Sequence, residues 1–140
     1  MEFTPEIKKA TQPIYQKISK TIPEIEWSTH APYIYEINKL KKEKNAVILA
    51  HNYQTPEIYH GISDFSADSL ALAVEAAKTK ADIIVMCGVH FMAETAKLMC
   101  PNKKVLLPDM KAGCSLSSSI TGEDVRKLKK QNPGVPVVSY

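Results

Sequence analysis

Short apolar runs alternate with amphipathic segments along most of this chain, and that alternation restricts the fold more than any other feature. Three runs have the length of strands that are buried on both faces: residues 46–50, 83–87 and 104–107. Another apolar run starts at residue 135 and continues to Tyr140, which predicts the beginning of a fourth strand. Helical patterns fall between and after these runs, at residues 68–80, 91–99 and 121–131.

The alternation of strands and helices predicts an α/β protein. Consecutive parallel strands are joined by right-handed crossovers, whose helices cover the sheet. We therefore expect a three-layer α/β/α fold with a short, mainly parallel four-stranded sheet. Helical patterns interrupted by proline, at residues 5–21 and 32–44 with a turn-like segment at 22–30, predict helices before the sheet. We divide the chain into an N-terminal helical extension, residues 1–35, and one α/β domain, residues 36–140.

The composition is that of an ordinary globular domain. The 140 residues, 44% of them hydrophobic and 24% charged, suffice for one buried core. The net charge of +3 comes mainly from lysine runs within residues 39–44 and at 129–130, which are typical of solvated helix faces. Since no basic patch is interleaved with aromatic residues, we expect no nucleic-acid partner.

The N-terminal segment predicts no export from the cell. Residues 1–20 are polar and charged, and no apolar run approaches the length of a membrane span. We therefore expect no membrane association and a cytoplasmic location. There, Cys87, Cys100 and Cys114 are reduced thiols or metal ligands rather than disulfides. The absence of Cys-x-x-Cys spacing excludes the simplest zinc ribbon, and Cys87 and Cys100 are most simply structural.

Polar residues follow the predicted strands at their carboxyl ends, where parallel sheets gather ligands. His51 and Tyr53 leave the first strand two residues apart, which places both side chains on one face of an extended segment. Imidazole titrates near neutral pH and a phenol can donate or accept a hydrogen bond, so the pair suits acid–base chemistry. The alternative is a loop histidine beside an aromatic ring that packs under the next helix.

Two further positions carry candidate chemistry. Ser69 follows Asp68 at the start of a predicted helix, where backbone N–H groups attract carboxylate or phosphate, with ordinary capping as the alternative. Cys114 lies in a loop of small residues after the third strand, where a thiolate can hold an iron–sulfur centre, with an ordinary thiol as the alternative. No Gly-x-Gly-x-x-Gly or Walker-type loop is present, which argues against the common nucleotide-binding folds.

Four segments resemble the quinolinate synthase family in their order and spacing. These are LAHNYQ at residues 49–54, ADSL at 67–70, GVHFMAE at 88–94, and LPD followed by AGC within 107–114. The resemblance covers roughly residues 36–140. It implies that these residues are the first of three similar α/β domains.

The resemblance also implies a reaction and roles for particular residues. Family members are transferases of NAD biosynthesis that condense iminoaspartate with dihydroxyacetone phosphate to quinolinate. They use a [4Fe-4S] cluster held by three cysteines, one from each domain, whose open iron acts as a Lewis acid. By this resemblance Cys114 is a cluster ligand, His51 and Ser69 bind the iminoaspartate carboxylates, and Tyr53 and Tyr140 assist proton transfer. Tyr140 is also implied as a substrate-binding residue.

The chain departs from the family in two respects. Ala67 stands where glycine is usual, and the chain stops at Tyr140, where family members continue into a second domain. Because two cluster cysteines are then missing, we predict that this chain alone is inactive. We also expect an exposed apolar face that docks the missing domains or mediates self-association. The alternatives are a stand-alone binding or interaction module that lost catalysis, and an unrelated metal-binding domain that uses Cys87, Cys100 and Cys114 together.

Overall fold

The computed structural model describes residues 1–138 of the chain. It contains two compact units, Met1–Met110 and Lys111–Tyr140. All of the strands found among the described residues belong to the first unit, which therefore holds the sheet and its cores. The predicted division at residue 35 stays a prediction. Within the described residues no helix combines the length and the apolar character that crossing a membrane would require.

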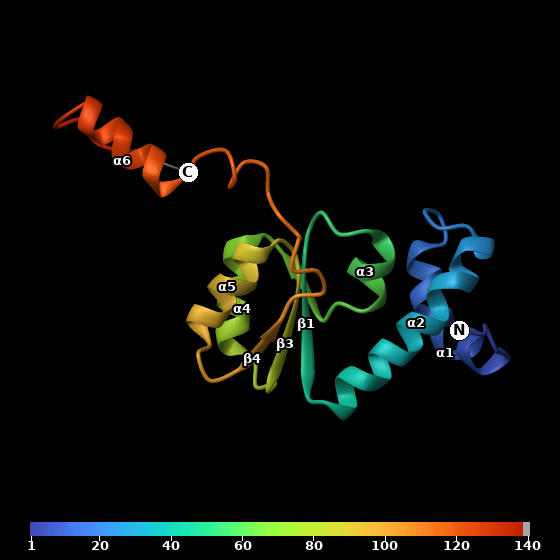
Figure 1. Ribbon diagram of the computed structural model, residues 1–140. Helices are drawn as coiled ribbons and strands as arrows, with labels where there is room; N and C mark the ends of the chain where they lie inside the picture. Colours follow the sequence, from blue (N-terminus) through green and yellow to red (C-terminus); the bar gives the residue numbers. More distant parts are fainter. Residues whose placement is uncertain (139–140) are drawn as a thin grey trace. The chain divides into compact units, whose positions relative to one another are not determined.

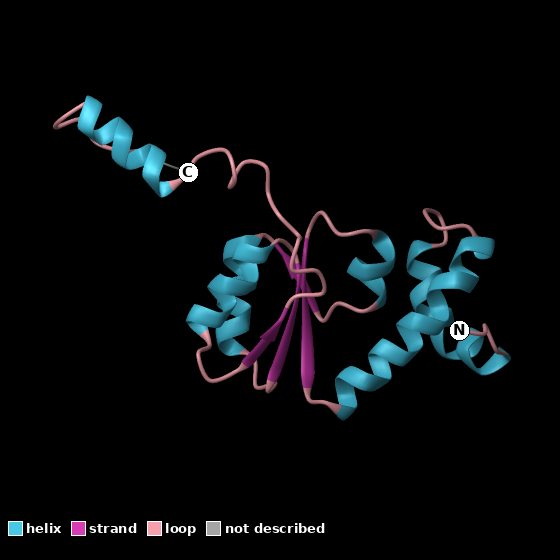
Figure 2. Cartoon of the chain, in the orientation of Figure 1, coloured by secondary structure: helices cyan, strands magenta, loops and turns pink. Residues whose placement is uncertain are grey.

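The sheet has four parallel strands, drawn in magenta in Figure 2. They are β1 (Ala46–His51), β2 (Phe65–Ala67), β3 (Ile83–Cys87) and β4 (Lys104–Leu106). Their order in the sheet is β2-β1-β3-β4. The register places Ala50 beside Cys87 and His51 beside Ala67, so the carboxyl ends of the three neighbouring strands meet at one edge. The predicted α/β class with a four-stranded parallel sheet is confirmed.

The identity of the fourth strand was predicted wrongly. Residues 135–138 form no strand, and Ser139 and Tyr140 lie outside the described residues. The fourth strand is instead β2, whose three residues are too short and too polar to stand out as an apolar run. A parallel strand also needs a neighbouring strand to pair with, and the described part of the second unit contains none.

One face of the sheet is covered by α4 (Ser69–Lys78) and α5 (His90–Met99), which lie together on one side of the strands in Figure 1. We call it the closed face. It buries one continuous cluster from both helices and the sheet: Leu49, Leu72, Ala76, Ile84, Met86, Met92, Ala93, Ala96 and Cys100. Each large side chain buried there contributes about 1.5–3 kcal/mol to stability.

The opposite face, which we call the open face, is covered only in part. Ile48, Ala50 and Cys87 are buried there, beneath side chains of α2 (Glu24–Glu43) and α3 (Pro56–Gly61). Beyond this cover lies a groove of about 470 Å³. Its lining is almost entirely apolar and includes Ile83, Val85, Leu106 and Pro108. Leu106 is 44% exposed, so this part of the sheet resembles an interior surface without its helix.

The helices before the sheet pack into a cluster of their own. The first, α1, spans Pro5–Ile18, and the predicted turn at residues 22–30 is wrong because α2 begins at Glu24 and contains Pro32. Trp27 is buried against Tyr15, with ring centroids 5.2 Å apart, and joins Ile18 and Ile34 in the cluster. Burial of these side chains outweighs the backbone hydrogen bond that a proline within a helix removes.

Asp64 holds β1 in place just before β2 begins. Its backbone N–H donates to the Ile48 carbonyl at 2.9 Å, and its carboxylate Oδ2 accepts from the Ile48 N–H at 2.8 Å. Lys41 of α2 lies 2.7 Å from the other carboxylate oxygen. The pair therefore links α2, β1 and β2 at the amino end of the sheet.

The second unit contains one helix, α6 (Gly122–Gln131), within its described residues. Thr121 caps it: its Oγ1 accepts from the Asp124 N–H at 3.2 Å, and Asp124 Oδ2 accepts from the Thr121 N–H at 2.9 Å. This reciprocal capping box starts the helix at the position where the predicted helical pattern, residues 121–131, begins. None of residues 111–138 is buried, so the described part of this unit has no apolar core.

Candidate functional site

His51 and Tyr53 lie together at the carboxyl end of β1. Their ring centroids are 4.1 Å apart and the ring planes meet at 34°. The Tyr53 N–H donates to His51 Nδ1 at 3.4 Å, so the neutral imidazole carries its proton on Nε2. Tyr53 is 54% exposed and His51 is half-buried, which leaves both side chains within reach of a ligand.

The turn that carries this pair is fastened to both neighbouring strands. The Asn52 N–H donates to the Ala67 carbonyl of β2 at 3.1 Å, and the Gln54 N–H donates to the His51 carbonyl at 3.0 Å. On the other side, Gln54 Nε2 donates to the Cys87 carbonyl of β3 at 3.2 Å. The turn is therefore held by hydrogen bonds rather than by apolar packing.

Ser69 follows the strand that pairs with His51. Ala67 is the register partner of His51, and Ser69 is two residues further along, at the first position of α4. Asp68 is the N-cap of this helix, and its carboxylate accepts from the Ala71 N–H at 2.9 Å. Capping therefore occurs, and the half-buried Ser69 hydroxyl remains beside first-turn N–H groups that have no partner within a helix.

Gly88 closes the other side of the site, directly after β3. A Cβ added at Gly88 would lie 2.8 Å from Met92 Sδ, 3.6 Å from Tyr53 Oη and 3.8 Å from His51 Cβ. A side chain here would therefore displace Met92 and crowd the two rings. The sequence pattern does not predict this close approach, because it depends on where the two rings pack in the folded sheet.

The remaining predicted site residues lie in the second unit. Cys114 is half-buried, and its carbonyl accepts from the Ser118 N–H at 3.0 Å. It stands in a loop with Ala112 and Gly113, small residues that leave room around the thiol. Tyr140 lies outside the described residues.

The three cysteines do not form a metal site within residues 1–138, where no group of three metal-ligating side chains occurs. Cys100 is buried and its thiol donates to the Ala76 carbonyl at 3.1 Å. Cys87 is buried at the end of β3, and burial raises the pKa of its thiol above the ordinary value. Their burial fits structural thiols, and the role of Cys114, which is half-buried, stays a prediction.

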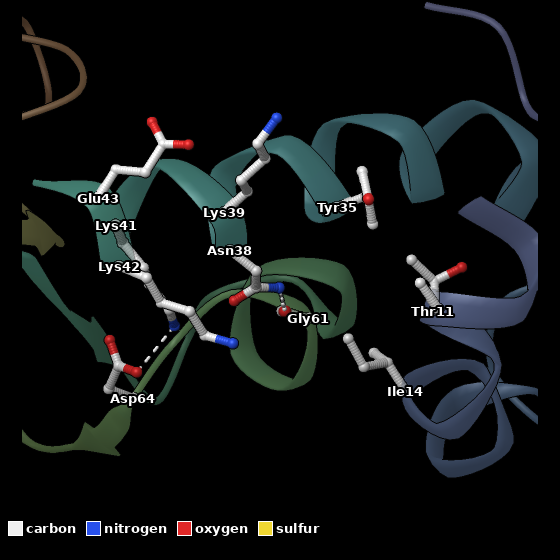
Figure 3. A pocket seen from close by; sticks show the side chains of 11 residues that line it. Thr11, Ile14, Tyr35, Asn38, Lys39, Lys41, Lys42, Glu43, Gly61 and Asp64 are labelled. Carbon is white, nitrogen blue, oxygen red and sulfur yellow. Dashed lines mark hydrogen bonds and ion pairs between the residues drawn. The ribbon is translucent and has the colours of Figure 1, made fainter. Parts of the chain in front are cut away.

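A larger pocket, of about 630 Å³, lies between α1, α2 and α3 (Figure 3). Two of its polar side chains bind across it: Asn38 Nδ2 donates to the Gly61 carbonyl at 2.8 Å, and Lys41 pairs with Asp64. These contacts fasten α2 to α3 and to the segment before β2. The pocket is lined by none of His51, Tyr53 and Ser69, and its contacts serve the packing of the helices.

The edge formed by His51, Tyr53, Ser69 and Gly88 is the best candidate site in the first unit. An imidazole and a phenol in ring contact can move a proton to or from a bound molecule. A serine hydroxyl at a helix start favours an anionic group beside them. This combination suits a small, negatively charged ligand that undergoes proton transfer.

Comparison with known proteins assigns a family to this arrangement of residues. The model of a family described as Quinolinate synthetase A protein matches residues 35–140. A quinolinate synthase of Caulobacter vibrioides is 62% identical over 138 residues, which are 99% of this chain and 38% of that protein. One from Sinorhizobium fredii is 61% identical over 140 residues, which are 100% of this chain and 39% of that protein.

A third relative matches over a shorter stretch. A quinolinate synthase of Xylella fastidiosa is 63% identical over 107 residues, or 76% of this chain and 32% of that protein. The chain thus spans between 32% and 39% of the length of these relatives.

Proposed function

This chain belongs to the Quinolinate synthetase A protein family, and we propose that it forms the first α/β domain of a quinolinate synthase. The proposed reaction condenses iminoaspartate with dihydroxyacetone phosphate and releases quinolinate, phosphate and water. The observation that carries the proposal is the ring contact of His51 and Tyr53 at the sheet edge from which Ser69 also starts α4, within the region that matches the family.

In this proposal the first unit binds the dicarboxylate. His51 and Ser69 receive the carboxylates of iminoaspartate, helped by the positive end of the α4 dipole. Tyr53, in contact with His51, moves protons at the reacting carbons, and Tyr140 shares that task. The tilted ring contact supports this assignment because one ring can orient the other toward the same ligand.

The proposed cofactor is a [4Fe-4S] cluster, which would supply an open iron as a Lewis acid when bound. Cys114 would hold it as one thiolate ligand, which suits a half-buried thiol among small residues. The donor set of this chain fits one cluster ligand and not three. We therefore propose that this chain alone is inactive and that other parts of the enzyme supply the remaining cysteines.

A second candidate function is a binding or interaction module of the same fold. The open-face groove favours it, since an apolar sheet face of this kind suits docking of another polypeptide. The two candidates differ in whether a complementary polypeptide restores turnover. They also differ in whether substitution of His51 or Tyr53 lowers that turnover.

The deciding experiment joins residues 1–140 to the part of the Caulobacter vibrioides enzyme that follows its matched segment. We expect the anaerobically prepared fusion to form quinolinate, whereas the 140-residue chain forms none. His51→Ala and Tyr53→Phe should each lower kcat/KM by 10²-fold or more, of the order expected for loss of an acid–base group. His60→Ala and Tyr33→Phe are matched controls, because Tyr33 is 52% exposed and His60 is also exposed.

Iron–sulfur reconstitution tests the cofactor separately. We expect the 140-residue chain to hold no stable cluster, and the fusion to hold one that Cys114→Ser abolishes. Iron and sulfide content and visible absorbance provide the readout. A fusion with full cluster content in the Cys114→Ser variant would remove Cys114 from the proposal.

A further inference from the structure

Gln54 spans the distance between the turn that carries His51 and Tyr53 and the neighbouring strand. Its backbone N–H donates to the His51 carbonyl at 3.0 Å, which closes the turn. Its side-chain amide donates at 3.2 Å to the carbonyl of Cys87, the last residue of β3. One residue therefore fixes both the shape of the turn and its place on the sheet.

The surroundings of Tyr53 indicate why a hydrogen bond from the turn to β3 matters for the position of its ring. The side chain is 54% exposed, so core packing does little to hold it. Its hydroxyl passes over Gly88, where an added Cβ would lie 3.6 Å away. Cys87 directly precedes Gly88 in the chain, so the carbonyl that accepts from Gln54 is one residue away from the glycine that faces the Tyr53 hydroxyl.

We infer that Gln54 is a positioning residue: its amide holds the His51–Tyr53 pair in ring contact at the edge of the sheet. Without this bond the turn keeps the Asn52–Ala67 hydrogen bond on the β2 side but loses its attachment to β3. The rings can then separate, because no side chain of the turn any longer ties it to the Cys87 carbonyl of β3. The effect of Gln54 on catalysis rests on the proposed function, whereas its effect on the ring geometry is independent of that function.

NMR spectroscopy of the 140-residue chain tests the ring geometry without any substrate. The parent should show nuclear Overhauser contacts between the His51 and Tyr53 rings and ring-current shifts of the His51 protons. Gln54→Glu keeps the size of the side chain but loses the donor, and Gln54→Met also loses the polar group. Both variants should lose these signals while the shifts of the closed face stay unchanged. Gln131→Glu, on α6, is the control that should retain them.

The fusion enzyme tests the catalytic meaning. Gln54→Glu and Gln54→Met should lower kcat by about 10–100-fold, as expected for a misplacement on the order of 1 Å, and leave KM within about threefold. Retention of the ring signals in both variants would overturn the inference, whatever the activity. Loss of the signals with no turnover by the parent fusion would uphold the positioning role and reject the proposed function instead.

Discussion

The closed and open faces belong to the same strands, but helices cover the closed face more completely than the open face. On the closed face, Leu49, Ile84 and Met86 are covered by two helices and are almost inaccessible to solvent. On the open face, α2 and α3 cover the β1 side, and the groove continues over β3 and β4. A parallel sheet normally carries helices over both faces. The closed face therefore serves stability, and we expect the open face to serve association.

The largest expected effect comes from removing a side chain from the closed face. Leu72→Ala removes a fully buried leucine of α4 and should lower the free energy of unfolding by about 2–5 kcal/mol, because a cavity replaces packed atoms. Urea unfolding followed by circular dichroism measures this change. Leu70→Ala, in the same helix but 76% exposed, should change it by no more than about 0.5 kcal/mol. Equal effects of the two variants would mean that the closed face is not packed as described.

The thiols provide a second comparison. Cys87 should react with iodoacetamide at least about tenfold more slowly than Cys114, since burial keeps the reagent away and raises the pKa of Cys87. A raised pKa delays formation of the thiolate, so the labelling rate of Cys87 should keep rising at pH values above the ordinary thiol pKa. Mass spectrometry of the peptides separates the sites. Similar rates at both cysteines would show that the open face admits solvent more freely than its burial indicates.

The capping box of α6 tests whether the second unit contributes to either face. Thr121→Ala should cost this helix about 1 kcal/mol and leave unfolding of the sheet unchanged. The hydrogen bonds from Thr121 lower the pKa of Asp124 in the parent. The stabilisation they give is thus present above the ordinary carboxyl pKa and is lost as the pH falls through the lowered one. NMR titration of Asp124 should show its pKa moving upward in the variant. An unchanged pKa would contradict the role of the cap.

The smallest effect on stability is expected on the open face. Leu106→Lys should change the free energy of unfolding by about 0.5 kcal/mol or less, because Leu106 is already 44% exposed at the edge strand. The same change should reduce self-association of the chain, measured by sedimentation velocity over a range of concentrations. A parent chain that sediments as a monomer at the highest concentration would reject the open face as an association surface in the isolated chain.

Periodicity in the sequence identified the elements that form cores. The apolar runs containing Leu49 and Ile84 became β1 and β3, because strands buried on both faces contain little else. The helix start at Thr121 was equally readable, since its cap is local. The elements that depend on distant contacts were missed: β2 forms beside β1, and the first turns of α2 form around the buried Trp27.

In the candidate site, too, the features that depend on local sequence were predictable and those that depend on distant contacts were not. The position of His51 and Tyr53 at a strand end was predictable from the pattern, and their ring contact was consistent with their spacing. The roles of Gln54 and Gly88 were not, because both depend on where β3 lies in the folded sheet. The roles of Ser69, Cys114 and Tyr140 stay predictions.

The contacts of Asp64 also bear on whether a foreign strand can add to β1. Both backbone groups of Ile48 are occupied by a single aspartate, so at that residue β1 offers no free donor or acceptor on its outer side. A strand from another molecule cannot add there in register without first displacing the Asp64–Lys41 ion pair. A charged side chain thus occupies the place that a longer β2 would take, and the folded sheet offers no open backbone edge at Ile48.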